Sequence, residues 1–278
     1  MPLVRDRDGK RLHVKSKLMG ESLVGKTFNK NLESRVQFRS FPEVNVLKVG
    51  GQSITDMGAK GLLPVIKEIV ENSNQHKMII STGGGTRSRH IYAIAMELGM
   101  PTGIISTLGQ SVSEQNALII STLLSPYGGI KIGHDDMPKL AGYFNQGCIP
   151  VMHGMPPYGY WEHPPKEGSL PPNRTDVGAY LLAEVIGAKR CIFVKDEDGL
   201  YTDNPKKNSD VKLIPKIGAQ ELIDMDLEDL IVERAILDLL LCSRSVTEIQ
   251  IINGLKQGNI TKALNGEHVG TIIYKDID

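Results

Sequence analysis

A lysine followed by two glycines stands near the end of an apolar run. Residues 44–51 are VNVLKVGG, so Lys48 is followed closely by Gly50 and Gly51. A lysine in such a turn can neutralise the oxygens of a transferring phosphoryl group, while glycine amides approach them closely. The alternative is a tight turn with a solvated lysine. These residues alone leave both interpretations open.

Three consecutive glycines follow a second apolar run. They are Gly83, Gly84 and Gly85, and the helical pattern that they open carries Arg87 and Arg89 in its first turns. Backbone amides in such a turn form a nest for an oxyanion. The spacing is not that of a P-loop, because no Gly-Lys-Ser/Thr follows. A flexible turn before a basic helix start is the weaker alternative, because cations near a helix N-terminus need a compensating anion.

Two further segments carry carboxylates. Asp176 stands at a predicted helix start, where it either caps the helix or positions lysines. Lys195 ends an apolar strand, and a carboxylate-rich turn, DEDGLYTDNP, follows over 196–205. Such a turn can hold Mg²⁺ or orient a lysine, and Tyr201 with Pro205 offers a flat apolar wall for a base. The alternative is a solvated turn.

These motifs fall at the ends of repeated strand-loop-helix units. Apolar runs predict strands at 44–49, 78–82, 148–154, 190–195, 248–252 and 269–274. Helical periodicity covers 59–70, 87–99, 108–124, 176–187 and 236–241. Repeated units of this kind predict an α/β fold with a parallel sheet covered on both faces. Ligands in such sheets bind at the carboxyl ends of the strands, where the motifs lie.

Composition excludes several classes of protein. The chain has 278 residues, of which 40% are apolar and 23% charged, so it can bury a sizeable core. Lys plus Arg and Asp plus Glu each number 32, so no global charge favours nucleic acid or an anionic membrane. No apolar stretch approaches the roughly 18 residues of a membrane span. The three cysteines are widely spaced, and we predict a protein of the reducing cytoplasm.

Together the four motifs resemble the amino acid kinase superfamily, in particular its uridylate-kinase-like branch. The matching segments are 48–51, 83–89, 175–176 and 198–205. The last reads Asp-Gly-x-Tyr-Thr-x-x-Pro, which holds the nucleotide in that family. The resemblance implies an open αβα sandwich with a mainly parallel central sheet over residues 42–278, which binds ATP with Mg²⁺. Residues 1–41 lack a clean period and are predicted to form an N-terminal arm.

The resemblance also implies the site residues. The predicted catalytic residues are Lys48, Asp176 and Lys195. The predicted nucleotide-binding residues are Lys48, Gly50, Gly51, Gly83, Gly84, Gly85, Arg89, Lys195, Asp196, Asp198, Gly199, Tyr201, Asp203 and Pro205. Asp196 is the predicted contact for Mg²⁺.

The acceptor half departs from the uridylate kinases. The acidic residue with which those enzymes hold the acceptor ribose falls on Ser106, which lacks a carboxylate's paired acceptors. A longer loop over 153–174, with Met-Pro-Pro-Tyr and Pro-Pro-x-Arg-Thr-Asp, resembles the molybdenum storage proteins, and residues 193–202 resemble their beta subunit. The consecutive histidines of the alpha subunit are absent, which leaves His153 and His163. These two either contact the oxometal or are structural or solvated.

Three functions follow as hypotheses. The leading one is a beta-like subunit of a molybdenum or tungsten storage protein, which uses ATP to pack molybdate or tungstate in an oligomeric cage. We expect a homo-hexamer, or a hetero-hexamer with an alpha-like subunit, with contacts from the helix over 108–124 and the arm. The first alternative is phosphoryl transfer from ATP to UMP or another small acceptor. The second is a nucleotide-binding assembly protein without catalysis.

Overall fold

The computed structural model describes residues 3–5, 9, 12–14, 38–208 and 210–276. The chain divides into two units, Met1–Phe38 and Arg39–Asp278. In the first unit, β1 (Leu3–Arg5) pairs antiparallel with β2 (Leu12–Val14). Most of the predicted arm lies outside the described residues. Arg39 belongs to the second unit, because its guanidinium donates hydrogen bonds to the carbonyls of Gly187 and Ala188.

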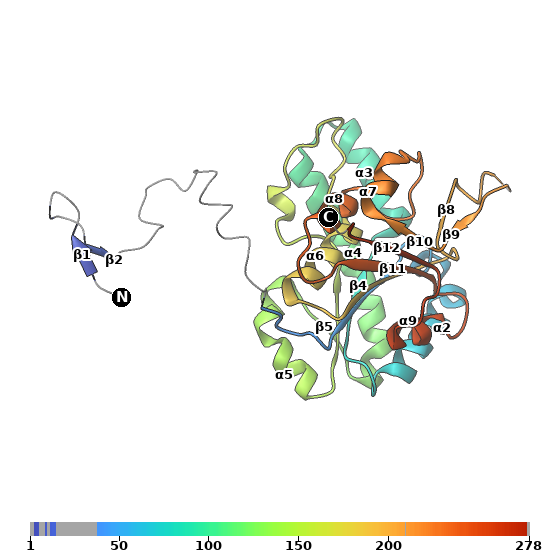
Figure 1. Cartoon of the computed structure of the whole chain (residues 1–278), viewed down its shortest axis with the longest axis horizontal. Coiled ribbons are helices and arrows are strands. Elements are labelled where there is room, and N and C mark those ends of the chain that lie inside the picture. The colour runs from blue at the N-terminus through green and yellow to red at the C-terminus, as the bar shows by residue number, and fades with distance from the viewer. Residues whose placement is uncertain (1–2, 6–8, 10–11, 15–37, 209, 277–278) are drawn as a thin grey trace. The chain divides into compact units, whose positions relative to one another are not determined.

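An eight-stranded sheet forms the centre of the second unit (Figure 1). Its strands are β3 (Asn45–Val49), β4 (Met78–Thr82), β5 (Gly129–Lys131), β6 (Ile149–His153), β7 (Arg190–Lys195), β10 (Lys216–Gly218), β11 (Glu248–Asn253) and β12 (Thr271–Tyr274). They lie in the order β10-β12-β11-β7-β3-β4-β6-β5. Every neighbouring pair is parallel except β11 with β12. The prediction of a mainly parallel sheet is confirmed.

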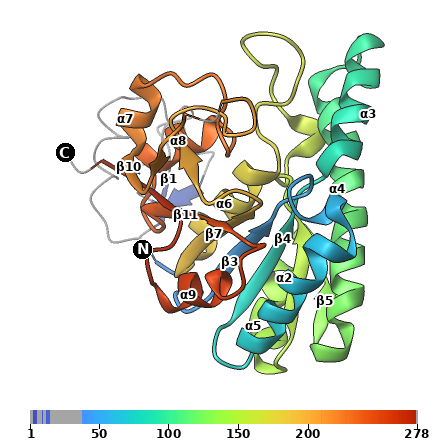
Figure 2. The same cartoon turned by 90° about the vertical axis from the view of Figure 1, so that its right-hand side faces the viewer.

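Helices cover both faces of this sheet (Figure 2). One face carries α5 (Leu140–Asn145), α6 (Thr175–Ile186), α7 (Ala219–Asp224) and α8 (Ala235–Leu241). The other carries α2 (Ala59–Asn72), α4 (Thr102–Leu124) and α9 (Asn259–Asn265), and α3 (Gly85–Glu97) packs on α4. This is the predicted αβα sandwich. No helix in the described part of the chain has the length and apolarity that crossing a bilayer requires.

The central strands are buried along their whole length. Every residue of β3, β4 and β6 is buried, as parallel strands covered on both faces must be. Alternate residues of β3 serve opposite layers: Val46 packs in the layer of α6, and Leu47 in the layer of α2 and α4. Burial of one such aliphatic side chain stabilises the fold by roughly 1.5–3 kcal/mol. Apolar packing on both faces therefore holds the strand ends, and the motifs on them, in fixed positions.

Several elements differ from the predicted ones. The helix predicted over 108–124 begins earlier, at Thr102. The sequence predicted a shorter helix because Gly103 and Gly109 interrupt the apolar period, but both glycines suit close packing. A Cβ on Gly103 would lie 2.0 Å from the Tyr160 carbonyl oxygen, and one on Gly109 would lie 1.9 Å from the Tyr92 hydroxyl. The short strands β5 and β10, the helices α5 and α7, and the hairpin of β8 (Leu200–Tyr201) with β9 (Leu213–Ile214) were not predicted.

The remaining short turns are 3-10 helices. They are η1 (Thr55–Met57), η2 (Ser125–Tyr127), η3 (His134–Lys139) and η4 (Gly159–Trp161). Two of them bear on the site, because η1 follows the first glycine turn and η4 lies in the long loop before α6.

Candidate nucleotide site

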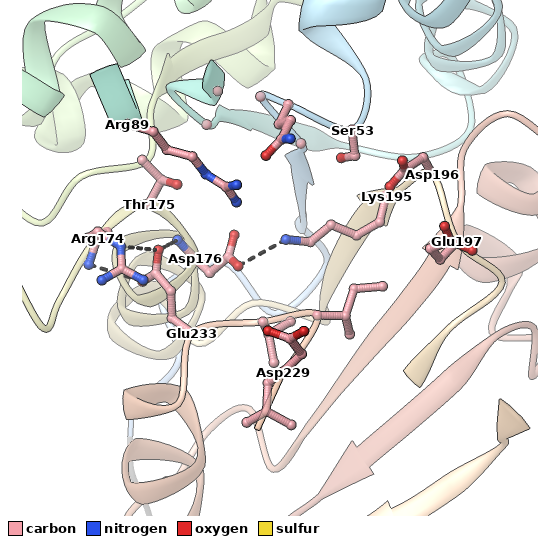
Figure 3. A pocket seen from close by; sticks show the side chains of 18 of the residues that line it. Ser53, Arg89, Arg174, Thr175, Asp176, Lys195, Asp196, Glu197, Asp229 and Glu233 are labelled. Atoms are coloured by element: carbon pink, nitrogen blue, oxygen red, sulfur yellow. Dashed lines mark hydrogen bonds and ion pairs between the residues drawn. The ribbon is translucent and has the colours of Figure 1, made fainter. Parts of the chain in front are cut away.

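A cavity of about 740 Å³ opens at the carboxyl ends of β3, β4 and β7 (Figure 3). This volume is in the range of pockets that bind nucleotides and other small molecules. The predicted residues that line it are Lys48, Gly50, Gly51, Gly83, Gly84, Gly85, Arg89, Asp176, Lys195, Asp196, Gly199, Tyr201, Asp203 and Pro205. Segments that lie far apart in the sequence thus meet in one cavity.

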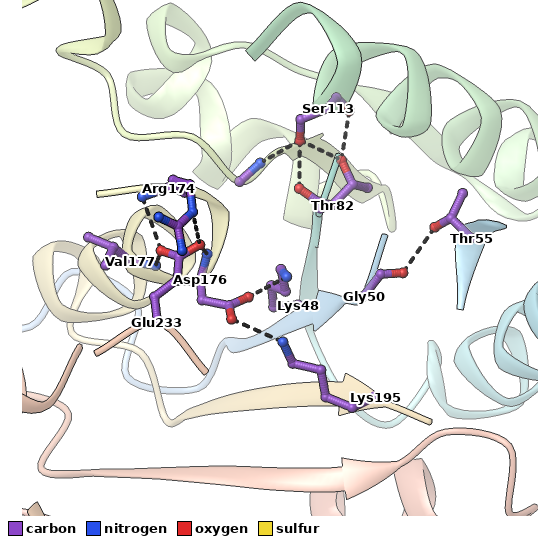
Figure 4. A network of polar contacts seen from close by, with 12 residues as sticks. Lys48, Gly50, Thr55, Thr82, Ser113, Arg174, Asp176, Val177, Lys195 and Glu233 are labelled. Atoms are coloured by element: carbon purple, nitrogen blue, oxygen red, sulfur yellow. Dashed lines mark hydrogen bonds and ion pairs between the residues drawn. The ribbon is translucent and has the colours of Figure 1, made fainter. Parts of the chain in front are cut away.

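Of the three predicted catalytic residues, Asp176 contacts both lysines (Figure 4). The Asp176 carboxylate forms one ion pair with the Lys48 ammonium and another with Lys195, whose Nζ lies 3.0 Å from Oδ2. All three side chains are buried. The solvated lysine that was considered for Lys48 is therefore wrong. The capping role that was considered for Asp176 is wrong too, because its carboxylate faces the lysines and no side chain of the helix start caps α6.

Burial and charge act in opposite directions on this cluster. Burial raises the pKa of the Asp176 carboxyl, but the charges of Lys195 and Lys48 outweigh it and hold the pKa well below its ordinary value. Burial lowers the pKa of Lys195 below its ordinary value, although the Asp176 carboxylate opposes the shift. Two ammonium groups are thus held by one carboxylate at the ends of β3 and β7. Such an arrangement suits the stabilisation of charge on phosphate oxygens.

The two glycine turns touch through their backbones. A Cβ on Gly51 would lie 2.2 Å from the Gly85 amide nitrogen, so a side chain at Gly51 would force the turns apart. Gly85 has a φ of 73°, in the left-handed region that favours glycine. Asp56, which the sequence did not single out, accepts a hydrogen bond of 2.6 Å from the Thr86 amide. Its charge supplies part of the anion that the basic start of α3 requires.

The two arginines of α3 behave differently. Arg87 donates to the side-chain oxygens of Gln115 and Asn116 on α4. Arg89 projects into the cavity (Figure 3) and makes no hydrogen bond or ion pair with any other described residue. An exposed guanidinium in this position is available to an anionic ligand.

The opposite wall of the cavity comes from the acidic turn and the hairpin. Tyr201, Asp203 and Pro205 line it. Asp196 lines it as well, and its Oδ2 accepts a hydrogen bond of 2.7 Å from the Lys206 ammonium. Mg²⁺ is commonly held by one or two carboxylates together with water and phosphate oxygens. Asp196 fits that requirement with one carboxylate oxygen, since its Oδ1 has no partner among the described residues.

Three predicted residues lie away from the cavity lining. The Asp198 carboxylate accepts hydrogen bonds from Asn253 and Lys256 instead. His153 is buried beside His134, with ring centroids 4.5 Å apart, whereas His163 is exposed. Burial and the neighbouring His134 charge lower the pKa of His153 to about 4, so the ring is neutral near pH 7.

Metal binding by these histidines stays a prediction. Over the described ranges, no three or more His, Cys, Asp or Glu side chains gather where they could hold a metal ion. His153 lies 3.8 Å from the Glu114 carboxylate. On its own loop, His163 Nε2 accepts a hydrogen bond from the Asn173 side-chain amide and lies 3.6 Å from the Glu162 carboxylate. The two rings therefore lie in different surroundings.

Sequence reasoning missed Glu233, which holds the start of the helix that carries Asp176. Its carboxylate accepts backbone hydrogen bonds from Arg174, Asp176 and Val177 at 3.0, 3.2 and 3.0 Å (Figure 4). Burial, followed by the charge of Asp176, raises the pKa of the Glu233 carboxyl. No local signal marks Glu233, because the amides that it binds lie more than 50 residues earlier in the chain.

Replacement of Tyr201 by alanine is expected to weaken ATP binding about tenfold. The rate at which the protein turns over ATP once it is bound should not change. An aromatic wall contributes about 0.5–1.5 kcal/mol beyond burial of its area, and it does not touch the transferring phosphate. Isothermal titration with ATP measures the dissociation constant. Tyr127→Ala, an exposed tyrosine on η2 outside the cavity lining, is the matched control. An ATP affinity equal to that of the unmodified protein would remove Tyr201 from the site.

Comparison with known families agrees with this geometry. A family model described as the amino acid kinase family matches residues 43–253. The chain belongs to the amino acid kinase family. It is 45% identical to molybdenum storage protein subunit beta of Azotobacter vinelandii over 256 residues, which cover 92% of this chain and 95% of that protein. The resemblance predicted from the four motifs is therefore confirmed.

Other members of the amino acid kinase family are also similar. Uridylate kinase of Methanobrevibacter smithii is 30% identical, over 72% of this chain and 84% of that enzyme. The structure resembles UMP kinase from Bacillus anthracis with a TM-score of 0.64 at 20% identity, over 85% of this chain and 98% of that one. It resembles uridylate kinase from Archaeoglobus fulgidus with a TM-score of 0.62 at 24% identity, over 82% and 99%. The two solved structures support the fold alone.

Proposed function

We propose that the chain is a beta-like subunit of an assembly that stores molybdate or tungstate and uses ATP with Mg²⁺ to load them. The observation that carries the proposal is the 45% identity to molybdenum storage protein subunit beta along 92% of the chain. A cavity with a lysine-carboxylate-lysine cluster supports the use of ATP.

In the proposed reaction, the γ-phosphate of ATP lies between the glycine turns and the lysines. In this hydrolysis, water attacks the γ-phosphorus, and the bond from that phosphorus to the β–γ bridging oxygen breaks to give phosphate and ADP. Lys48 and Lys195 neutralise the charge on the phosphoryl group and on the departing ADP, and Asp176 holds both ammonium groups in place. Asp196 would hold Mg²⁺ through one carboxylate oxygen, and the ion would supply further positive charge to the phosphate oxygens. Tyr201 and Pro205 face the base.

The acceptor half supports storage over transfer to UMP. Ser106, which takes the place of the acidic ribose contact of uridylate kinases, is fully buried in α4 and does not line the cavity. A buried hydroxyl in that position cannot bind a sugar. The long loop before α6 also presents Tyr160 and Trp161 to the surface, with 60% and 81% of their area exposed. Exposed aromatic side chains of this size suit contact with a neighbouring subunit.

Storage requires an assembly, because a single domain of this size cannot enclose a cavity for many oxoanions and keep a packed core. The outer face of α4 presents Leu118, Ile119 and Leu123 to the surface, which supports its proposed role in subunit contacts. We propose a hexamer, either of this chain alone or with an alpha-like partner. A formal net charge of zero offers little long-range repulsion between copies.

The experiment that tests the proposal measures metal content and ADP release together. Purified protein is incubated with ATP, Mg²⁺ and molybdate, with sulfate in place of molybdate as the control, and is then analysed by elemental analysis and native mass spectrometry. We expect a hexamer-sized particle that accumulates molybdenum only when ATP is present. A stable monomer at micromolar concentration would exclude the cage.

The same assay separates the alternatives. Stoichiometric formation of UDP from UMP without bound metal would establish a uridylate kinase and exclude storage. Slow ADP release that is indifferent to UMP and to molybdate would favour a nucleotide-binding assembly protein.

A further inference from the structure

The segment between α7 and α8, residues 225–234, contacts two parts of the cavity wall: the start of α6 and the loop after β8. Asp229, Leu230, Ile231 and Val232 line it, and the next residue is Glu233. In Figure 3 the side chains of Asp229 and Glu233 lie on neighbouring parts of this segment, with Glu233 directed to the start of α6. We call residues 225–234 the coupling segment.

One end of the coupling segment holds α6. Glu233 accepts backbone hydrogen bonds from Arg174, Asp176 and Val177, and its Oε1 lies 3.6 Å from the Arg174 Nε. The first amides of a helix have no partner within the helix. Asp176 lies in this first turn, so the Glu233 carboxylate fixes the backbone from which Asp176 reaches the two lysines.

The middle of the coupling segment holds the loop after β8. The Asp229 carboxylate accepts hydrogen bonds from Asn204 at 2.9 Å and Lys207 at 2.7 Å. Asn204 stands between Asp203 and Pro205, in the wall that we assign to the base. A nucleotide that orders this wall therefore also restrains Asp229.

The coupling segment itself is held in a defined shape. The Arg234 guanidinium donates to the carbonyls of Leu227 and Glu228. Asp226 has a φ of 43°, and it is the one residue other than glycine with a positive φ among the described residues. A residue kept in this sparsely populated conformation indicates that the surrounding contacts determine the turn. These contacts tie Arg234, which follows Glu233, to the two carbonyls that precede Asp229, so the backbone from Asp229 to Glu233 is closed into a loop.

We infer that Glu233 is a positioning residue through which occupation of the base wall aligns Asp176 with Lys48 and Lys195. The inference rests on the proposed binding of ATP. In this inference, the coupling segment aligns the lysines and Asp176 when a nucleotide base occupies its wall of the cavity. Without the Glu233 carboxylate, three amides at the start of α6 are unpaired, and the Asp176 carboxylate lies between the lysines less often.

Glu184 offers a matched control on the same helix. Its carboxylate also accepts hydrogen bonds from three backbone amides, those of Arg244, Ser245 and Val246, but it does not line the cavity. Glu233→Gln and Glu184→Gln therefore remove the same charge from the same kind of amide cluster. Only the first removes it from the turn that carries Asp176.

The test is hydrogen exchange of the Asp176 and Val177 amides in the full chain, with and without a non-hydrolysable ATP analogue and Mg²⁺. We expect the analogue to slow this exchange roughly tenfold in the unmodified protein, a typical size for coupling between sites. We expect the slowing to disappear in Glu233→Gln and to persist in Glu184→Gln. If Glu233 had only a structural role, Glu233→Gln would speed the exchange of these amides without the analogue. The analogue would still slow the exchange as much as in the unmodified protein.

The remaining outcomes are also decisive. Asp229→Asn keeps Glu233 and weakens its link to the base wall, so it should reduce the slowing even if Glu233→Gln does not fold. Equal slowing in all folded variants would overturn the inference while leaving the proposed function standing. Titration of the unmodified protein with the analogue is the separate check on that function, and failure to bind would overturn both.

Discussion

Lys48→Ala is expected to lower ATP turnover by two to three orders of magnitude. A group aimed at the charge that develops in the transition state typically contributes about 10²–10³ in rate. The fold should persist, because Asp176 keeps its ion pair with Lys195 after Lys48 is removed. Coupled measurement of ADP release gives the rate, and circular dichroism checks the fold.

Lys67→Ala is the matched control for Lys48→Ala. Lys67 is an exposed lysine on α2 whose one ion pair among the described residues is with Glu71 at the surface, so its loss should leave turnover unchanged. ATP turnover in folded Lys48→Ala that equals the rate of the control would reject the proposed role of Lys48.

Asp176→Asn should have the larger effect on stability. It leaves two buried ammonium groups beside each other with no carboxylate, and breaking a buried ion pair from one side costs about 3–5 kcal/mol. ATP turnover should also be lost, because neither lysine is held in place. Urea unfolding measures the free energy, with Asp238→Asn on α8 as the control, because Asp238 is exposed and forms no ion pair with another described residue. Equal unfolding free energies for the two variants would contradict the buried cluster.

The pH dependence of that difference has a definite sign. The pKa of folded Asp176 lies below its ordinary value, so its stabilising contribution is complete above the unfolded pKa of about 3.9. It is lost as the pH falls through the lower folded pKa. The difference in unfolding free energy between the unmodified protein and Asp176→Asn should therefore be largest near neutral pH and shrink in acid. A difference that grows below pH 4 would contradict this account.

Much of the site followed from local patterns. Lys48, the glycines at 83–85 and Lys195 stand at the ends of apolar runs, and the carboxyl ends of neighbouring parallel strands meet at one edge of a sheet. The runs at β3, β4 and β7 therefore sufficed to bring these residues together before any contact was known. The resemblance to the family followed from the same residues, because the motifs combine several specific residue types at fixed spacing.

Contacts between distant segments were beyond the sequence. Glu233 and Asp56 bind amides of α6 and α3 from other parts of the chain, and neither stands in a pattern that marks it. Asp198 belongs to a motif that predicts nucleotide contact, yet its carboxylate faces Lys256. The direction of a side chain depends on its neighbours in the fold, and the residue type alone does not determine it.

By itself, the sequence determined the α/β sandwich, the order of its strands and helices along the chain, and the lysines and glycines of the phosphate end, because hydrophobic period and turn residues are local properties. Only the tertiary structure decided that Lys48 is buried in a shared ion pair and that Asp176 holds two lysines instead of capping its helix. It also decided that Glu233 secures the turn from which Asp176 projects. Burial and pairing depend on the packing of segments that are separate in the sequence, which no local pattern specifies.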